Sequence, residues 1–245
     1  MPPKESVSCE MGEPLLSVVI PIFNEEAILD TAARALHQRL QTRGYSFEIL
    51  LAENGSTDST RLIAAALESE LPEVRVLEIG EPNYGRALRC GIEAASGKYV
   101  ICDEIDLGDV DFYDRAVALL ETGADMVVGS KRHPHSNDAR PWLRRQGTAV
   151  MNSLLRFALD FRGTDTHGLK AFRRERLLPV VASCIVEQNL FASELVIRAG
   201  RVGLDVREIP LHLREIRPPS VGLMRRVPNV MFDLGRLIWI IRVHR

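Results

Sequence analysis

The 245-residue sequence contains four cysteines, at positions 9, 90, 102 and 184, and no two of them have C-x-x-C spacing. This scatter provides neither a zinc site nor a disulfide framework, so a reducing cytoplasm is the expected location. No run approaches the roughly 18 apolar residues that a membrane-spanning helix needs. Residues 1–13 contain no apolar stretch of a signal peptide. We therefore expect a cytoplasmic protein that is soluble or peripheral on the inner face of a membrane.

The chain also lacks an excess of charge of either sign. A net charge of −2 gives no strong positive field for a phosphate backbone, which argues against nucleic acid as a partner. The length fits one large α/β domain, and no repeat, low-complexity stretch or linker divides it. We expect a folded domain over residues 15–220, a flexible tail at 1–14 and an amphipathic helix at 221–245.

Apolar runs bounded by turn residues predict strands, and between them apolar residues recur at helical spacing. Strands that alternate with helices of this kind indicate βαβ units and a mostly parallel sheet. The expected strands span residues 15–21, where Pro21 would end the strand, and then 47–52, 74–79, 99–102, 126–128 and 205–210. The first expected helix opens at residues 23–26 and ends at Gly44, and the others span 59–71, 85–95, 111–121, 144–159 and 187–200.

Carboxylates are concentrated directly after the expected strand at 99–102, in Asp103, Glu104, Asp106 and Asp109. Desolvating an unpaired carboxylate costs several kcal/mol, so these acids should lie past the carboxyl end of the strand, where α/β sheets bind ligands. In an extended chain Glu104 and Asp106 would leave the same face. Two oxygen ligands on one face suit Mg²⁺ or Mn²⁺, whereas the alternative for the cluster is an acidic, solvated turn.

Polar clusters end successive strands of the expected sheet. They are Pro21-Ile-Phe-Asn-Glu-Glu26, Glu53-Asn-Gly-Ser-Thr-Asp58 and Glu104-Ile-Asp106, and they are accompanied by 83–87, 128–131, 165–170, 208–210 and 217–220. In order and spacing these stretches resemble the family 2 glycosyltransferases of the GT-A fold, from about Leu15 to Ser220. Within that family they look most like the polyprenyl- and dolichyl-phosphate mannosyl- and glucosyltransferases. The resemblance implies a single Rossmann-like α/β domain, with a mostly parallel sheet flanked by helices.

The resemblance implies an inverting, metal-dependent transfer of a hexose from GDP-mannose or UDP-glucose to a polyprenyl phosphate. It places Mg²⁺ or Mn²⁺ on Asp106 and Glu104, with Asp103 as an alternative first acid. The residues that it implies for the nucleotide sugar are Pro21, Phe23, Glu25, Glu53, Asn54, Gly55, Asp58, Gly85, Asp103, Lys131 and Arg132. The residues that it implies for the acceptor phosphate are Arg214, Arg217, Ser220 and His167, and His167 is also open as a metal ligand or a structural loop histidine.

Two departures from the family pattern leave the donor open. The family usually has Asp-x-Asp where this chain has Glu104-Ile-Asp106, and two aspartates where this chain has Glu53-Asn54. Glutamate is one methylene longer, so the metal or the base would sit differently. The same changes keep open the alternative that the protein is a non-catalytic scaffold that binds a nucleotide sugar.

The acceptor class depends on a general base. A hydroxyl acceptor needs one, because an alcohol is a poor nucleophile at neutral pH. Relatives that use a hydroxyl carry an aspartate in a Glu-Asp pair, whereas this chain has Ser193-Glu194-Leu195. A lipid monophosphate is already anionic and needs only orientation. The missing aspartate favours the phosphate acceptor, while Glu194 stays the candidate base of a rival enzyme that acts on a saccharide or small-molecule hydroxyl.

From Val221 to Arg245 the apolar residues follow a helical stripe that arginines flank, with Trp239 near the end. Such a helix either lies in the interface of a membrane with anionic lipid or packs on the domain. The expected partners are therefore a nucleotide-sugar donor, a lipid-phosphate acceptor and a membrane surface, and a homo-oligomer stays open.

Overall fold

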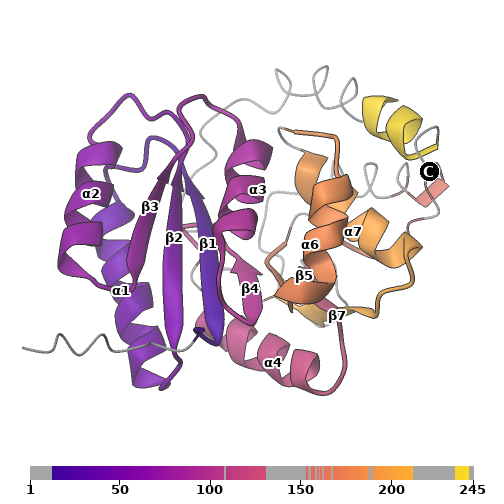
Figure 1. The fold of residues 1–245 in the computed structure, drawn as a ribbon, viewed down its shortest axis with the longest axis horizontal. Helices are drawn as coiled ribbons and strands as arrows, with labels where there is room; N and C mark the ends of the chain where they lie inside the picture. The colour runs from indigo at the N-terminus through magenta and orange to yellow at the C-terminus, as the bar shows by residue number, and fades with distance from the viewer. Residues whose placement is uncertain are drawn as a thin grey trace, which may run out of the picture.

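The structure is a computed structural model that describes residues 13–107, 109–130, 153, 156–157, 159, 161, 163–166, 168–187, 190–211 and 235–242. Seven strands in this part of the chain form one sheet in the order β3-β2-β1-β4-β6-β5-β7 (Figure 1). The strands are β1 (Leu16–Ile22), β2 (Phe47–Glu53), β3 (Val74–Glu78), β4 (Tyr99–Cys102), β5 (Met126–Ser130), β6 (Lys170–Arg173) and β7 (Val206–Pro210). The helices are α1 (Leu29–Thr42), α2 (Thr60–Glu70), α3 (Tyr84–Ala94), α4 (Val110–Glu121), α6 (Arg174–Ser183) and α7 (Phe191–Arg201).

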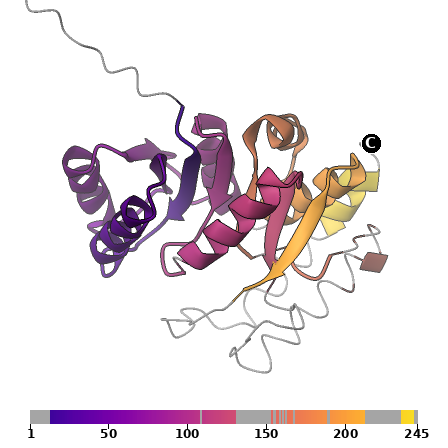
Figure 2. The same cartoon turned by 90° about the horizontal axis from the view of Figure 1, so that it is seen from below.

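Helices cover both faces of the sheet (Figure 2). On one face α1, α2 and α4 pack on alternate residues of β1, such as Val18 and Ile20. On the other face α3, α6 and α7 pack on the intervening side chains, such as Val19. The burial of both faces explains why the strands read as continuous apolar runs. The predicted single α/β domain with a mostly parallel sheet is confirmed.

Most of the expected elements are found within one or two residues of their predicted bounds, but Pro21 does not end β1. The strand runs on to Ile22, and Pro21 pairs with Ala52 of β2. The carbonyl of Val19 accepts a hydrogen bond from the backbone of Asp103, so Val19 faces β4. Pro21 is two residues further and faces the same side, beyond the end of β4. Its missing N–H therefore leaves no gap in the ladder.

The first helix also differs from the expectation. Residues 26–28 form a turn, and α1 begins at Leu29 rather than opening at residues 23–26 with the acids in its first turn. The backbone N–H groups of Ile28 and Leu29 both donate to the carbonyl of Glu25. The acidic pair therefore belongs to the loop at the end of β1 and not to the first turn of α1.

Residues 170–183 contain two elements that the sequence pattern does not predict. β6 lies between β4 and β5 and is antiparallel to both. Cys102 at the end of β4 pairs with Lys170, and Val128 near the end of β5 pairs with the same residue. The start of β6 therefore lies at the same edge of the sheet as the carboxyl ends of the parallel strands.

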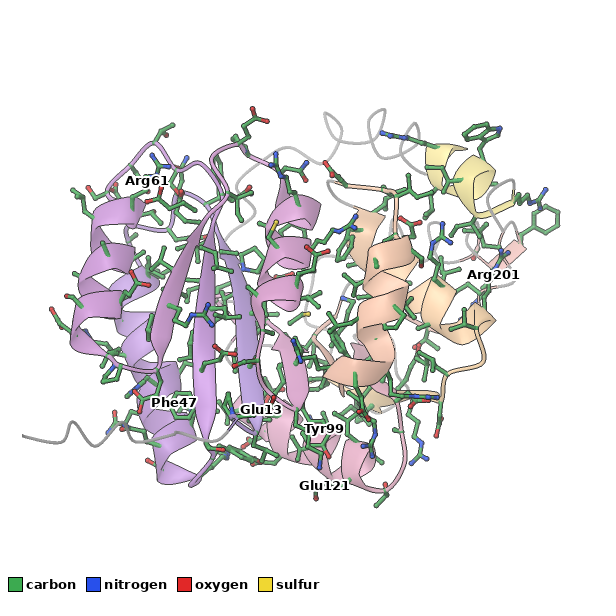
Figure 3. All side chains as sticks on the ribbon, in the orientation of Figure 1. Glu13, Phe47, Arg61, Tyr99, Glu121 and Arg201 are labelled. Atoms are coloured by element: carbon green, nitrogen blue, oxygen red, sulfur yellow. The ribbon has the colours of Figure 1, made fainter. Side chains whose placement is uncertain are left out.

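The two edges of the sheet differ in what they carry. Figure 3 places Phe47 and Tyr99, which begin β2 and β4, at the lower edge, and Arg61 at the upper edge. The loops that follow β1, β2, β3 and β4 therefore meet at the upper edge. That edge holds all the polar clusters that the sequence analysis singled out among the described residues.

Three expectations lie wholly or largely outside the described residues: the tail at 1–14, the helix at 144–159 and the first part of the helix at 221–245. Residues 235–242 are helical, and Leu237, Ile240 and Ile241 are buried in the same core as α6 and α7. Cys102 is buried in the sheet, and burial raises the pKa of its thiol to about 12. Among the described residues, no helix combines the length and the apolarity that crossing a membrane requires.

Glu48, a buried acid on β2, forms hydrogen bonds with several segments at the lower edge of the sheet. Its Oε1 accepts hydrogen bonds from Ser17 Oγ at 2.6 Å and from Ser96 N at 2.7 Å, and its Oε2 accepts from Arg75 Nη1 at 2.8 Å. Burial alone would raise the pKa of Glu48, but these hydrogen bonds outweigh it and hold the pKa below its usual value.

Glu48→Gln should lower the free energy of unfolding at pH 7 by about 2–3 kcal/mol, because charge-assisted hydrogen bonds to a buried carboxylate are lost. The native pKa is depressed, so this contribution is complete above the unfolded pKa of roughly 4.3 and is lost as the pH falls through the native pKa. Urea unfolding at pH 7 and below pH 4 measures both effects. The exposed carboxylate of Glu93, which pairs with Arg89, provides the control, because Glu93→Gln should change stability by less than about 0.5 kcal/mol at either pH.

Candidate active site

The loops after β1 and β2 bind each other through side chains. Asn24 N donates to Ser56 Oγ at 3.0 Å, and Thr57 N donates back to Asn24 Oδ1 at 2.8 Å. Glu25 N donates to Thr60 Oγ1 at 2.7 Å. Asn24 adopts a φ of +54°, a conformation that asparagine tolerates better than most residues. The two loops therefore form one rigid rim beside Phe23, whose ring is 41% exposed.

A second set of reciprocal bonds explains Asp58. Its Oδ2 accepts from Glu26 N at 3.3 Å, and its Oδ1 accepts from Thr60 N at 2.9 Å. Ser59 N donates back to Glu26 Oε2 at 3.0 Å. Asp58 thus holds the rim together at the start of α2.

Glu53 and Asn54 lie buried below this rim. Glu53 Oε1 accepts from Ser56 N at 2.5 Å, and Oε2 accepts from Arg61 Nε at 3.0 Å. Burial alone would raise the pKa of Glu53, but the hydrogen bonds, led by that from Ser56, hold the pKa below its usual value. Asn54 Oδ1 accepts from Asn83 N at 2.6 Å. A negative charge is therefore fixed at this position of the edge.

Gly55 and Gly85 complete this part of the edge. Gly55 has a φ of +77°, and a Cβ there would lie 2.9 Å from the carbonyl oxygen of Gly80. Gly85 is buried in the first turn of α3, which Asn83 caps by accepting from Arg86 N at 3.1 Å. The polar stretches at the ends of β1, β2 and β3 therefore lie side by side, as the sequence predicts.

The four acids after β4 have different surroundings. Asp103 is buried, accepts from Tyr113 Oη through Oδ2, and accepts from Glu104 N through Oδ1 at 2.7 Å. Asp109 caps α4 by accepting from Phe112 N at 3.1 Å. Glu104 and Asp106 are half-buried and reach the surface of the edge. Packing therefore buries Asp103, whereas Glu104 and Asp106 stay within reach of a ligand.

The expectation of an extended chain through Glu104 and Asp106 is wrong. Leu107 N donates to the carbonyl of Glu104 at 3.0 Å, so residues 104–107 form a tight turn. The turn still keeps both carboxylates at the end of β4. Its cause is local, because Asp103 turns inward to Tyr113 and the chain must double back to begin α4.

This acidic cluster changes the electrostatics of its neighbours. Burial raises the pKa of Asp103 to about 7, against the hydrogen bond from Tyr113. Burial also raises the pKa of Tyr84 well above 10, and the charge of Glu104 raises it further. Tyr84 therefore lies against the acids, although the sequence analysis assigned it no role. The only sequence signal was its place in the stretch 83–87.

Glu104 and Asp106 fit a hard divalent cation in ligand type, since carboxylate oxygens are what Mg²⁺ and Mn²⁺ prefer. Asp106 has no hydrogen bond to any described side chain, which leaves its carboxylate available to such an ion. Within the described ranges no three acidic, histidine or cysteine side chains converge as a complete metal site. Further ligands would come from the substrate, from water or from a residue outside the described ranges such as His167.

The loop before β6 lies against the end of β5. Thr164 donates to the carboxylate of Glu208 on β7, from its backbone N to Oε1 at 2.6 Å and from its hydroxyl. The hydroxyls of Ser130 and Thr164 are 2.6 Å apart. Lys170 is buried at the start of β6, and its Nζ donates to the carbonyl of Gly168 at 2.7 Å. This buried cation at the upper edge was not among the predicted site residues.

Glu194 is fully buried on α7, and both of its oxygens are bound. Oε2 accepts from Ile185 N at 3.0 Å and Val186 N at 2.7 Å, and Oε1 accepts from Arg198 Nε at 2.7 Å. The neighbouring Ser193 instead meets Thr166 of the loop before β6, with 2.9 Å between the hydroxyls. Glu194 therefore holds the chain before α7 and leaves no oxygen without a partner.

Glu194→Gln should lower the free energy of unfolding by about 2–3 kcal/mol, because the buried guanidinium of Arg198 loses its counter-charge. For a domain of this size the thermal midpoint should fall by roughly 5–10 °C. Sugar transfer measured well below that midpoint should stay within about tenfold of wild type. Loss of transfer by more than about 10²-fold at unchanged stability would instead identify Glu194 as a general base.

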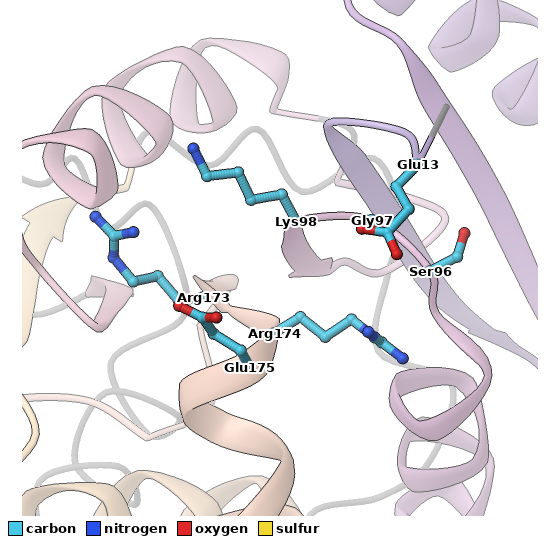
Figure 4. Close-up of a pocket in the computed structure, with 7 residues that line it drawn as sticks. All are labelled: Glu13, Ser96, Gly97, Lys98, Arg173, Arg174 and Glu175. Atoms are coloured by element: carbon cyan, nitrogen blue, oxygen red, sulfur yellow. The ribbon is translucent and has the colours of Figure 1, made fainter. Parts of the chain in front are cut away.

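A separate hollow of about 230 Å³ lies at the opposite edge (Figure 4). It is lined by Glu13, Ser96, Gly97, Lys98, Arg173, Arg174 and Glu175. Arg173 donates to the carbonyls of Leu120 and Ala124 at the end of α4, and Lys98 lies 4.9 Å from the ring centre of Tyr99. Arg173 and Lys98 therefore have structural contacts, and the hollow is remote from the acids after β4.

The structure thus brings together the predicted residues from 21 to 106 at one edge and places Glu194 in the core beside it. Six predicted residues lie outside the described part of the chain: Lys131, Arg132, His167, Arg214, Arg217 and Ser220. Their assignments stay predictions.

Comparisons with known proteins agree with this arrangement. Residues 17–180 match the family described as glycosyl transferase family 2. An uncharacterized glycosyltransferase of Mycobacterium tuberculosis is 32% identical over 201 residues, which cover 81% of this chain and 85% of the relative. The undecaprenyl-phosphate 4-deoxy-4-formamido-L-arabinose transferase of an Enterobacter species is 28% identical, over 89% of this chain and 66% of its own length.

Solved structures of glucosyl-3-phosphoglycerate synthase from Mycobacterium tuberculosis have the same fold. The complex with Mn²⁺ and UDP-glucose superposes with a TM-score of 0.64 at 22% identity, covering 92% of this chain and 79% of that one. The complex with UDP gives the same TM-score at 21% identity, over 92% and 80% of the two chains.

Proposed function

Because the chain belongs to glycosyl transferase family 2, we propose that it moves a hexose from a nucleotide sugar to the phosphate of a polyprenyl lipid, with inversion at the sugar. The donor is GDP-mannose or UDP-glucose. Its nucleotide would lie on the rim formed by the loops after β1 and β2. Phe23 offers an exposed ring there, and Glu53 lies below it. Oε1 of Glu53 is bound to Ser56 N and Oε2 to Arg61 Nε, so a hydrogen bond to the base would use a second lone pair of one of these oxygens.

Glu104 and Asp106 would hold Mg²⁺ or Mn²⁺ at the end of β4. When bound, the metal supplies positive charge that stabilises the nucleoside diphosphate as it leaves. Asp103 is the weaker candidate for the first acid, because its two oxygens already bind Tyr113 and the backbone of Glu104. The structural neighbour from Mycobacterium tuberculosis binds Mn²⁺ together with UDP-glucose, which supports the same donor chemistry here.

The choice of acceptor class rests on Glu194, because both of its carboxylate oxygens already accept hydrogen bonds within the protein. A hydroxyl acceptor needs a base, and the carboxylate on α7 that would provide it is fully used within the core. A phosphate acceptor at neutral pH is an anion and reacts without losing a proton. The relative whose name specifies undecaprenyl phosphate supports the same acceptor. The residues proposed to orient that phosphate are Arg214, Arg217, Ser220 and His167, with Lys131 and Arg132 proposed at the donor phosphates.

The test is transfer from radiolabelled GDP-mannose and UDP-glucose to polyprenyl phosphate, with Mg²⁺ or Mn²⁺ and with a chelator. We expect label in the lipid fraction with one donor, and its loss on chelation. Label that appears in a water-soluble glycoside would favour the enzyme that acts on a hydroxyl. Binding of a nucleotide sugar without transfer or hydrolysis in any pairing would favour the scaffold.

A further inference from the structure

The helical residues 235–242 bury their apolar stripe in the protein core. Leu237, Ile240 and Ile241 are each at most 3% exposed and pack in the core of α6 and α7. Trp239 lies between them in sequence but is 60% exposed. The stripe is therefore core, and the residue left at the surface is a large aromatic one. Leaving this ring in water forgoes the free energy that its burial would provide.

Arg201 at the end of α7 joins this helix to a second exposed aromatic residue. Its Nη1 donates to the carbonyl of Ile241 at 3.0 Å, and its Nη2 donates to the carbonyl of Leu159 at 3.3 Å. One guanidinium therefore holds two distant segments side by side at the right-hand end of the molecule (Figure 3). Phe157 is 91% exposed on the second segment, and Val202, next to Arg201, is 64% exposed.

Exposed apolar residues are concentrated on the segments that Arg201 holds together. Six large hydrophobic side chains are exposed among the described residues, and Phe157, Val202 and Trp239 are three of them. Single exposed apolar residues need no explanation, whereas a cluster marks an interaction surface. We name these three residues, together with Arg156, Arg236 and Arg242, the Arg201 surface.

The charge of the Arg201 surface has one sign. Arg156, Arg236 and Arg242 are exposed, and residues 235–245 contain no acidic residue. Aromatic rings combined with arginines match the boundary of a bilayer that carries anionic lipid, where rings enter the interface and guanidinium groups meet phosphates. Arg156 also donates to the carbonyl of Gly163, from Nε at 3.2 Å and from Nη2 at 3.0 Å, which fixes its position on this surface.

The position of this surface suits a lipid substrate. In Figure 1 the helical residues 235–242 lie at the upper right, and in Figure 3 the loop region marked by Arg61 lies at the upper edge. A bilayer that touches the Arg201 surface at this end would therefore lie next to the upper edge of the sheet. We propose that the Arg201 surface docks the protein on membranes containing anionic lipid, and this proposal deepens the proposed function by bringing the catalytic edge to a lipid phosphate.

Tryptophan fluorescence tests the docking. The chain has two tryptophans, Trp142 and Trp239, so Trp142→Phe leaves Trp239 as the reporter. Vesicles of phosphatidylcholine with phosphatidylglycerol should shift its emission to shorter wavelength, and pure phosphatidylcholine should shift it less. Each arginine near such a surface contributes about fivefold to partitioning, so Arg236→Gln with Arg242→Gln should weaken binding roughly 30-fold. The effect should shrink at high salt.

Co-sedimentation of the full chain with the same vesicles provides the matched comparison. Phe157→Ala with Trp239→Ala should reduce the bound fraction at least about tenfold, whereas Leu62→Ala, which removes a 76% exposed side chain from α2, should leave it unchanged. The proposal would be overturned if the Phe157→Ala, Trp239→Ala double variant bound vesicles as well as Leu62→Ala does. It would also be overturned if vesicles did not shift the emission of Trp239. A shift that follows protein concentration without vesicles would overturn it too, and would assign the surface to a second copy of the chain. Vesicle binding needs no donor, so binding combined with transfer to a soluble acceptor would overturn the proposed function and leave the docking intact.

Discussion

Asp106→Asn should lower kcat/KM for sugar transfer by at least about 10³-fold and leave the thermal midpoint within about 2 °C of wild type. Asparagine preserves the size of the side chain but removes the charge that would hold a divalent cation against the donor phosphates. The fold should not respond, because Asp106 has no hydrogen bond to a described side chain and lies half-buried in the turn after β4. Transfer assays with saturating Mn²⁺ and thermal unfolding of the same preparation measure both quantities.

Glu121→Gln is the matched control, because it removes an exposed carboxylate from the end of α4, at the lower edge of the molecule (Figure 3). It should keep transfer within about twofold of wild type. If Asp106→Asn transfers sugar at a tenth of the wild-type rate or more, the acids after β4 do not hold the metal. If the variant is inactive and its melting point has also dropped by 10 °C, Asp106 supports the fold rather than the reaction.

Gly168→Ala should destabilise the protein by about 3 kcal/mol or more and abolish transfer as well. A Cβ at this position would lie 1.6 Å from the carbonyl oxygen of Gly129, a backbone atom at the end of β5. No side-chain rotation relieves that overlap, so either the loop before β6 or the end of β5 must move. The loop carries Thr164, which binds Glu208, and the carbonyl that Lys170 binds. Thermal unfolding should show a drop of roughly 10 °C.

The chain provides its own comparison in Gly200. A Cβ there would meet no atom within 4 Å, and the residue lies near the end of α7. Gly200→Ala should therefore stabilise the protein by up to about 1 kcal/mol, since alanine loses less backbone entropy in a helix. An unchanged midpoint in Gly168→Ala, with normal transfer, would show that the loop can leave β5 without consequence, and the close approach of the two backbones would have no role.

The sequence predicted strands best where both faces of the sheet are buried. β1, β2 and β4 are apolar runs bounded by turn residues, and their bounds were recovered closely. β6 was missed because its four residues, Lys170 to Arg173, contain only two apolar side chains and pair in the antiparallel direction. α6 was missed because Pro179 lies inside it, and proline normally argues against a helix interior.

The site was predictable in location but not in the role of each acid. Strand ends with polar residues point to one edge of the sheet from pattern alone. The spacing of the four acids does not show that Asp103 accepts a hydrogen bond from Tyr113. It also does not show that Asp109 caps α4. Glu194 presents the same difficulty, because its counter-charge Arg198 and the N–H groups at 185 and 186 meet only in the folded core. Tertiary packing decides these roles, so a single sequence does not contain them in readable form.

The antiparallel insertion of β6 has a consequence for the order in which the sheet is made during synthesis. β1 to β4 lie within residues 16–102 and are joined by short crossovers, whereas β5 connects to β4 only through residues 170–173. While the ribosome adds residues 103–169, the apolar run Tyr99–Cys102 forms an open edge of a growing sheet. Such edges pair readily with other chains. A nascent chain stalled in this interval therefore carries the completed rim of the loops after β1 and β2 beside an aggregation-prone edge, and synthesis of β6 provides the strand that covers this edge.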